Sequence, residues 1–329
     1  METTGEHPVV DQDDPDSDPA LFDDLTDDDD LGDDPLAVPA FRKAGAATSA
    51  KRGRLVTVTA KAGGVGKTSS TAHLAERAAQ KGMRVVAVDD RSQGDLRKRL
   101  GFDDSRTLLQ VALEWDGTAA TIGDWILHDP HLAADWIVGP DSGREDYDDS
   151  LIPDEMYGHL IDVLLGMYDV VFVDTTPARV DRAREQFFTT WAPRLAEDGR
   201  SAAVVVSEWD RAKLNNAREW SVTITNLGVD RSRVFFLPNH RFDPSAETSD
   251  ALPLDDVLRR FTSVRILDPL PFSQRVIDGN NGFGPPVAGL DEPAYRQSID
   301  AALRAILADA RFDPEPVQKR RLFGRKGRR

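Results

Sequence analysis

Short runs of apolar, β-branched residues alternate with longer stretches rich in Ala, Leu and Arg from residue 54 onward. The short runs are typical of buried strands, and the longer ones have the spacing of helices that cover a sheet. The predicted strands are Leu55–Ala60, Arg84–Asp89, Trp136–Val138, Val170–Asp174, Ala202–Ser207, Val234–Leu237 and Ser263–Leu267. The predicted helices are Lys67–Lys81, Met156–Met167, Val180–Ala192, Arg211–Leu227, Ala251–Phe261 and Ala294–Ala310. We therefore predict an α/β fold with a doubly wound, mostly parallel sheet of about seven or eight strands flanked by helices.

The two ends of the chain differ sharply in charge from the body between them. Residues 1–40 contain 15 acidic side chains and no lysine or arginine, whereas Lys319–Arg329 contains seven basic side chains and no acidic one. The net charge of −16 therefore describes mainly two opposite tails. The acidic segment has too few apolar residues to offset the entropy of ordering, so we predict that it is disordered. The expected division is an acidic tail (1–40), a basic linker (41–53), one domain (54–311) and a basic tail (312–329).

The absence of cysteine excludes several kinds of chemistry. The chain has no disulfide, no thiolate metal site, no cysteine nucleophile and no cysteine-ligated iron–sulfur cluster. No stretch approaches the length of a membrane-spanning apolar helix, and the N-terminus lacks the basic and apolar regions of a signal peptide. We therefore expect a cytoplasmic protein.

The strongest local signal is the segment KAGGVGKTS at residues 61–69, between a predicted strand and a predicted helix. In a phosphate-binding loop (P-loop), glycines let backbone N–H groups converge on phosphate oxygens at a helix N-terminus. Lys67 would reach the β and γ phosphates, and the Thr68 hydroxyl would bind Mg²⁺. A plain turn is the alternative interpretation, and Lys61 stands where the usual pattern has glycine. The predicted nucleotide-binding residues of this segment are Lys61, Gly63, Gly64, Val65, Gly66, Lys67, Thr68 and Ser69.

A second signal is the apolar strand Val170–Asp174, which ends in a carboxylate. In P-loop enzymes an Asp at this place holds Mg²⁺, usually through water. Thr68 and Asp174 are therefore the predicted metal site, and Thr175–Pro177 would form a loop beside the γ phosphate.

With these motifs the chain resembles the ParA/MinD family, the deviant-Walker ATPases that position plasmids, chromosomes, protein complexes or the division site. The resemblance covers about residues 54–310. Its motifs are GGVGKTSS at 63–70, VDDRSQGDL at 88–96, DTTP at 174–177, the strand ending in Asn239, and the turn Pro269–Pro271.

The resemblance implies ATP and Mg²⁺ as cofactors and a homodimer that sandwiches two ATP molecules. It also implies a carrier surface, which is nonspecific DNA for ParA-type members and membrane for MinD-type members, and a further partner protein. Lys67, Asp89 and Asp174 are the implied catalytic residues. Ser69 would contact phosphate, and Asn239 would read the adenine edge, although a structural turn after a strand is an equally good interpretation of Asn239.

Two positions depart from the family pattern. The signature lysine, five residues before Lys67, is replaced by Ala62, and a lysine stands one place earlier at Lys61. The second carboxylate of the D-x-D-P-Q-G motif is replaced by Arg91, whereas Asp89 is kept. Because a cation supplied across a dimer accelerates phosphoryl transfer strongly, we expect ATP·Mg binding with slow or partner-dependent hydrolysis.

Two compensations for these departures stay open. Lys61 could take the place of the missing signature lysine through a shift of its loop. Alternatively, Arg91 could supply charge near the phosphates, with Asp90 or Asp89 serving the attacking water.

The basic C-terminal tail allows three interpretations: an arm that binds DNA phosphates, an arm that lies on the acidic tail, or a MinD-like membrane anchor. Val317, Leu322 and Phe323 do not form one apolar stripe on a helix, which disfavours the membrane. We predict nonspecific DNA, and with it association with the nucleoid. The predicted contact residues are Lys319, Arg320, Arg321, Arg325, Lys326, Arg328 and Arg329.

The sequence thus favours a ParA-like protein that dimerises on ATP and positions or partitions DNA or a protein complex. One alternative is a hydrolysis-deficient, nucleotide-stabilised scaffold of a secretion, conjugation or polar complex. Another is a membrane-cycling regulator of MinD type.

Overall fold

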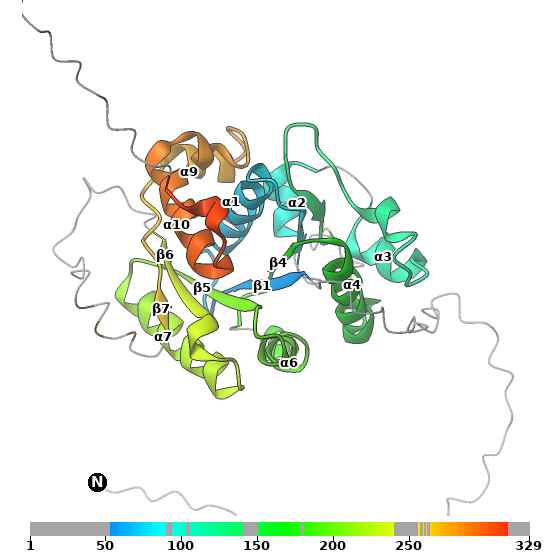
Figure 1. The fold of residues 1–329 in the computed structure, drawn as a ribbon, viewed down its shortest axis with the longest axis horizontal. Helices are drawn as coiled ribbons and strands as arrows, with labels where there is room; N and C mark the ends of the chain where they lie inside the picture. Colours follow the sequence, from blue (N-terminus) through cyan, green and yellow to red (C-terminus); the bar gives the residue numbers. More distant parts are fainter. Residues whose placement is uncertain are drawn as a thin grey trace, which may run out of the picture. The chain divides into compact units, whose positions relative to one another are not determined.

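The computed structural model describes residues 53–89, 94–102, 106–140, 151–178, 181–239, 256, 259, 261 and 264–314 (Figure 1). Several predictions concern positions outside these residues. They are the acidic tail, the basic linker up to residue 52, Asp90, Arg91, most of the predicted helix 251–261, and the basic residues 319–329.

The described strands form one seven-stranded sheet in the order β3-β2-β4-β1-β5-β6-β7, and every neighbouring pair is parallel. The strands are β1 (Arg54–Thr59), β2 (Val85–Asp89), β3 (Asp135–Ile137), β4 (Val170–Asp174), β5 (Ala202–Glu208), β6 (Val234–Asn239) and β7 (Arg265–Ile266). The predicted fold class is confirmed, and each predicted strand lies within a few residues of an observed one. The edge strand β7 is shorter than the predicted Ser263–Leu267: among the described residues its ladder with β6 contains Arg265 and Ile266, and Ser263 lies outside the described residues.

Helices flank both faces of this sheet (Figure 1). They are α1 (Lys67–Gln80), α2 (Asp95–Leu100), α3 (Leu108–Glu114), α4 (Asp154–Met167), α5 (Asp181–Gln186), α6 (Ala192–Glu197), α7 (Arg211–Asn226), α9 (Gln274–Asn280) and α10 (Pro293–Leu307). The sequence pattern did not predict α2, α3 and α9, because helices of six or seven residues are too short to show a helical period. No helix among the described residues is both long and apolar enough to cross a membrane.

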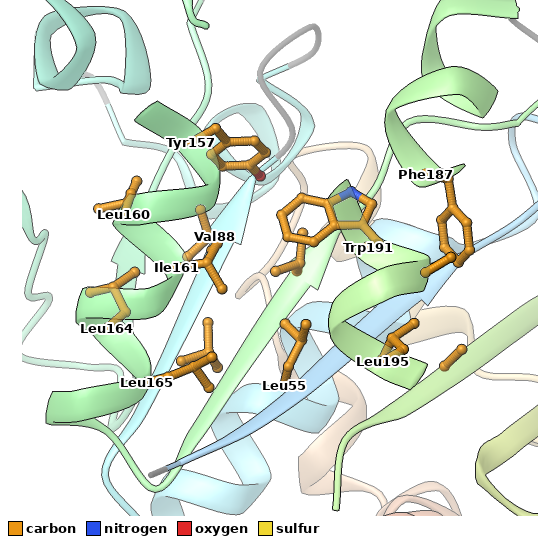
Figure 2. Close-up of a cluster of buried hydrophobic side chains, with 14 of the residues drawn as sticks. Leu55, Val88, Tyr157, Leu160, Ile161, Leu164, Leu165, Phe187, Trp191 and Leu195 are labelled. Atoms are coloured by element: carbon orange, nitrogen blue, oxygen red, sulfur yellow. The ribbon is translucent and has the colours of Figure 1, made fainter. Parts of the chain in front are cut away.

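Alternating strand residues separate two buried clusters, one on each face of the sheet. Leu55 packs with side chains of α4 and α6, whereas Val56 and Val58 pack with side chains of α1 and α10. Figure 2 shows Leu55 with Leu165 on one side and Leu195 on the other. Because successive strand side chains point to opposite faces, β1 is buried from both sides and forms the centre of the fold.

The predicted helix Val180–Ala192 is interrupted by a π-helical segment, Phe187–Trp191, between α5 and α6. Pro193 explains the interruption, because proline has no N–H to donate to the carbonyl of Thr189 in a regular α-helix. The segment buries Phe187 and Trp191, and Trp191 meets Tyr157 edge-on with their ring centroids 5.2 Å apart.

The parallel arrangement brings the carboxyl ends of the central strands to one edge of the sheet. In the strand register Asp174 stands opposite Val58 of β1 on one side and Asp89 of β2 on the other. Open α/β sheets bind their ligands at this edge, so the loops that follow β1, β2 and β4 are the place to look for a functional site.

Candidate functional site

The loop from β1 to α1 has the backbone of an anion-binding turn. Gly64 and Gly66 have φ angles of 74° and 87°, which L-residues with side chains rarely adopt. Gly66 is the N-cap of α1 and provides no side chain to cap it, so first-turn N–H groups remain for a ligand at the positive end of the helix dipole. A Cβ atom at Gly66 would also lie 2.1 Å from Nδ2 of Asn239.

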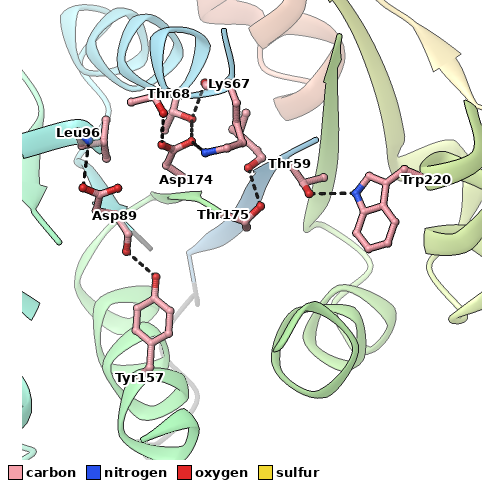
Figure 3. Close-up of polar contacts among 11 residues, drawn as sticks. Thr59, Lys67, Thr68, Asp89, Leu96, Tyr157, Asp174, Thr175 and Trp220 are labelled. Carbon is pink, nitrogen blue, oxygen red and sulfur yellow. Dashed lines mark hydrogen bonds and ion pairs between the residues drawn. The ribbon is translucent and has the colours of Figure 1, made fainter. Parts of the chain in front are cut away.

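The carboxylate of Asp174 holds both functional side chains of the P-loop (Figure 3). Lys67 Nζ lies 2.6 Å from Oδ1 of Asp174, and the Thr68 hydroxyl donates to Oδ2 across 2.6 Å. Thr71, one turn further along α1, donates to Oδ1 across 3.0 Å. The side chains of Lys67 and Asp174 are only 8% and 1% exposed, so this is a buried ion pair supported by two hydroxyls.

Asp89 lies beside Asp174 and connects three elements. Its Oδ2 accepts from the backbone N–H groups of Leu96 at 3.0 Å and Gly139 at 3.2 Å, which ties α2 to the segment after β3. Its carbonyl accepts from the hydroxyl of Tyr157 at 2.6 Å (Figure 3). Burial, and after it the charge of Asp174, raises the pKa of the Asp89 carboxyl well above its usual range.

The loop after β4 lies beside the start of the P-loop. Thr175 donates to the carbonyl of Val58 with its N–H at 3.0 Å and its hydroxyl at 3.1 Å, and the N–H of Ala178 donates to Ala60 at 2.8 Å. These bonds fix the predicted loop Thr175–Pro177 against the end of β1, next to the ion pair of Lys67 and Asp174.

A pocket opens on the other side of the P-loop. It holds about 350 Å³ of empty space, a figure that includes its open mouth. Gly66, Ser69 and Asn239 line it together with Asn280 at the end of α9 and Tyr295 of α10. Asn239 is anchored there because its Nδ2 donates to the carbonyl of Val65 across 3.0 Å.

The structure thus brings most of the predicted residues of the P-loop, Asp89, Asp174 and Asn239 around one edge of the sheet. Lys61 has a different neighbour: its Nζ lies 2.5 Å from Oε2 of Glu219 on α7. Ala62, at the position of the family's signature lysine, packs half-buried against the apolar cluster.

Sequence reasoning found Ser69 but not its two partners, Arg99 and Asn280. Ser69 Oγ accepts from Arg99 of α2 and donates to Asn280, and both distances are 2.7 Å. Arg99 belongs to a run of three basic residues, a pattern that usually indicates a solvated face. Its closeness to the P-loop arises only from the packing of α2 on α1.

The sequence profile of the CobQ/CobB/MinD/ParA nucleotide binding domain matches residues 56–282. The chain belongs to this family. The matched region begins within β1, ends in the turn after α9 and contains the P-loop, Asp89, Asp174 and Asn239. No curated protein sequence matches the chain at a significant level.

Solved structures of the family share the fold at low sequence identity. The ParA family ATPase from Chlorobium tepidum is 19% identical, with a TM-score of 0.61 over 79% of this chain and 100% of that one. The MinC:MinD cell division protein complex of Aquifex aeolicus is 18% identical, with a TM-score of 0.61 over 81% of this chain and 99% of that one. The septum site-determining protein MinD of Pyrococcus horikoshii, complexed with Mg-ADP, is 21% identical, with a TM-score of 0.59 over 75% of this chain and 92% of that one.

Proposed function

We propose that the chain binds ATP with Mg²⁺ and acts as a ParA-like protein that dimerises on ATP and helps to position or partition DNA or a protein complex. The contact of Asp174 with both Lys67 and Thr68 carries the proposal. An ammonium group, a hydroxyl and a carboxylate meet there at the N-terminus of α1, and these are the groups that a magnesium nucleotide requires.

The donor set suits Mg²⁺. The Thr68 hydroxyl and the Asp174 carboxylate offer oxygen atoms 2.6 Å apart, and Mg²⁺ prefers oxygen ligands and retains water or phosphate oxygens in its shell. Among the described residues no cluster of three or more His, Cys, Asp or Glu side chains could hold a metal ion. In this proposal Thr68 and Asp174 are the protein's ligands for Mg²⁺, and phosphate oxygens and water complete its shell.

The pocket beside Gly66 suits the nucleoside. Lys67 and Thr68 would face the terminal phosphates, and Ser69 borders the pocket one residue further along α1. Asn239 donates one amide proton to the carbonyl of Val65. Its side-chain amide has a second proton and an acceptor oxygen, and these would bind the edge of adenine. The solved MinD complexed with Mg-ADP has the same fold, which supports the binding of a magnesium nucleotide.

A hydrolysis-deficient, nucleotide-stabilised scaffold is the second candidate function. Ala62 favours it, because an alanine cannot supply the cation that family members extend to the partner's nucleotide. Lys61 is the adjacent ammonium, and in this structure it is bound to Glu219. We therefore propose slow or partner-dependent turnover for either function.

Nucleotide binding is tested by comparing the full chain with K67A and with K98A, which removes an exposed lysine of α2. Saturating Mg·ATP at about 100 times its Kd adds roughly 2.7 kcal/mol of stability, which raises Tm by about 5–10 °C in a domain of this size. We expect that rise for the unaltered chain and K98A, and none for K67A. Equal Tm with and without nucleotide in the unaltered chain would contradict the proposal.

Turnover and size separate the two functions. Phosphate release and molecular mass are measured in Mg·ADP and Mg·ATP, with and without duplex DNA. Dimerisation on ATP with phosphate release that DNA accelerates supports partition, whereas dimerisation without release supports the scaffold. A chain that stays monomeric in ATP contradicts the dimer in both.

Binding of DNA through the basic tail is tested with a chain that ends at residue 318. Seven neutralised phosphates give a salt slope as steep as about −6 in log K against log salt. We propose that the truncated chain loses that slope. An unchanged slope would assign DNA binding elsewhere.

A further inference from the structure

Arg99 connects three elements around the pocket. It lies in the last turn of α2, and its Nη1 donates to Ser69 Oγ of α1 across 2.7 Å. Its Nη2 donates across 2.6 Å to the carbonyl of Pro286, in the segment that follows α9. One guanidinium therefore lies directly behind a side chain that lines the pocket.

This guanidinium makes no hydrogen bond or ion pair with a carboxylate among the described residues, although the more distant charge of Asp174 acts on it. Its Nε is enclosed and makes no hydrogen bond to any of them. Burial lowers the pKa of Arg99 to about 10, so it stays charged at neutral pH. Buried charges in proteins are normally paired with an opposite charge, and a buried donor without an acceptor requires a reason.

The hydroxyl of Ser69 indicates where a negatively charged partner for Arg99 would bind. A serine hydroxyl has one proton and two lone pairs, and here it accepts from Arg99 and gives its proton to Oδ1 of Asn280. Both Ser69 and Asn280 line the pocket. An oxygen anion that entered beside Ser69 would take the place of Asn280 as acceptor and would bring a negative charge to Arg99.

The order of residues along α1 identifies that anion. Lys67 and Thr68 are at the Asp174 end of the P-loop, and Ser69 is at the border of the nucleoside pocket. In ADP and ATP the phosphate next to the nucleoside is the one attached to the ribose, and this is the phosphate that Ser69 would meet.

We propose that Arg99 is a positioning residue for this phosphate, acting through Ser69 and supplying positive charge from within the chain. The inference rests on the proposed nucleotide function and deepens it. In a chain that has Ala62 in place of the signature lysine, Arg99 would add a second cation of the same subunit, besides Lys67, to the nucleotide site.

The test compares R99Q, R99K and S69A with the double variant R99Q/S69A, using the full chain and Mg·ADP in calorimetric titrations. K98Q is the control, because Lys98 is the exposed neighbour on the same helix. A charge-assisted hydrogen bond is worth about tenfold to hundredfold in affinity. We expect R99Q to lose affinity by that factor, R99K to recover part of it, and K98Q to stay within twofold.

The double variant distinguishes positioning from a general structural effect. If Arg99 acts through Ser69, R99Q/S69A binds Mg·ADP more tightly than the product of the two single losses predicts. Multiplicative losses, or an R99K that is no better than R99Q, would overturn the inference. So would an R99Q that binds like K98Q while the unaltered chain binds Mg·ADP, which leaves the proposed function intact. An unaltered chain that binds neither Mg·ADP nor Mg·ATP overturns both.

Discussion

Lys61 at the start of the P-loop and Glu219 on α7 form an ion pair, with Nζ 2.5 Å from Oε2. The bond to Lys61 lowers the pKa of the Glu219 carboxyl, so Glu219 is ionised at neutral pH. Lys61 directly precedes Ala62, which occupies the position of the signature lysine. If Lys61 reaches the phosphates through a shift of its loop, its ion pair with Glu219 must break first.

Substitution E219Q tests this restraint. Both side chains are partly exposed, and exposed ion pairs contribute little to stability, so we expect Tm and the affinity for Mg·ATP to be unchanged. Releasing Lys61 should raise ATP turnover by no more than a few-fold, and K61Q should lower it. E114Q, an exposed glutamate of α3, is the control. Identical turnover of E219Q, K61Q and the unaltered chain would show that Lys61 has no part in hydrolysis.

Substitutions at two glycines with similar φ angles would distinguish the cost of backbone strain from the cost of a steric contact. Gly66 and Gly82 have φ angles of 87° and 81°, but a Cβ atom meets Asn239 only at Gly66 and meets nothing within 4 Å at Gly82. The left-handed conformation costs a non-glycine residue about 1–2 kcal/mol. We expect G82A to lose that much free energy of unfolding and to bind nucleotide normally. G66A should lose more and should bind nucleotide at least tenfold more weakly, as measured by urea unfolding and titration.

The double variant G66A/N239A completes that comparison. Removing the amide of Asn239 relieves the steric contact and leaves the backbone strain, so its unfolding free energy should lie closer to the G82A value. A G66A variant that matches G82A in stability would contradict the contact with Asn239.

The raised pKa of Asp89 predicts a pH dependence of stability. Because burial and Asp174 raise the folded-state pKa, the folded protein binds the proton more tightly than the unfolded chain. The resulting stabilisation is complete below the unfolded pKa of about 3.9 and is lost as the pH rises through the folded-state pKa. Relative to D89N, the unaltered chain should therefore become progressively less stable from about pH 4 upward, as followed by urea unfolding at several pH values.

Asp309 provides a control of opposite sign. Hydrogen bonds from Arg311 lower the pKa of its carboxyl to about 2. The contribution of Asp309 is therefore present above the unfolded pKa and is lost as the pH falls toward 2. D309N should cost stability at neutral pH and cost nothing at the acidic end. Parallel pH profiles for D89N and D309N would contradict both assignments.

The hydroxyl of Tyr157 holds the end of β2 in place. It donates to the carbonyl of Asp89 across 2.6 Å, and both residues are buried. Y157F keeps the ring and leaves this carbonyl without that donor, which should cost about 1–2 kcal/mol. We expect a lower urea midpoint with an unchanged m-value, because no further surface is exposed on unfolding. An unchanged midpoint would mean that another donor replaces the hydroxyl.

Most of the fold could be predicted because its signal is local. The strands of the central sheet are buried on both faces and appear as continuous apolar runs, such as Val170–Asp174. The helices α2, α3 and α9 could not be predicted, since their lengths are set by packing rather than by a periodic pattern. The π-helical segment before Pro193 was hidden for a similar reason, because its flanks read as one helix.

The candidate site was predictable where chemistry and order along the chain coincide. Lys67, Thr68 and Asp174 follow from a glycine-rich loop and a strand that ends in a carboxylate, and the structure brings these three together. Arg99 and Glu219 could not be found in this way, because their places depend on how α2 and α7 pack against the P-loop. Lys61 could be identified from the sequence but its partner could not.

The bond of Asp174 to both Lys67 and Thr68 has a consequence for selectivity. A bare anion such as orthophosphate could attract Lys67 only by leaving a buried carboxylate without its cation, which is strongly unfavourable. A magnesium nucleotide brings a replacement cation for Asp174 in the same step. Free phosphate in the cell should therefore be a weak competitor for this site, even though the site is built to hold phosphate.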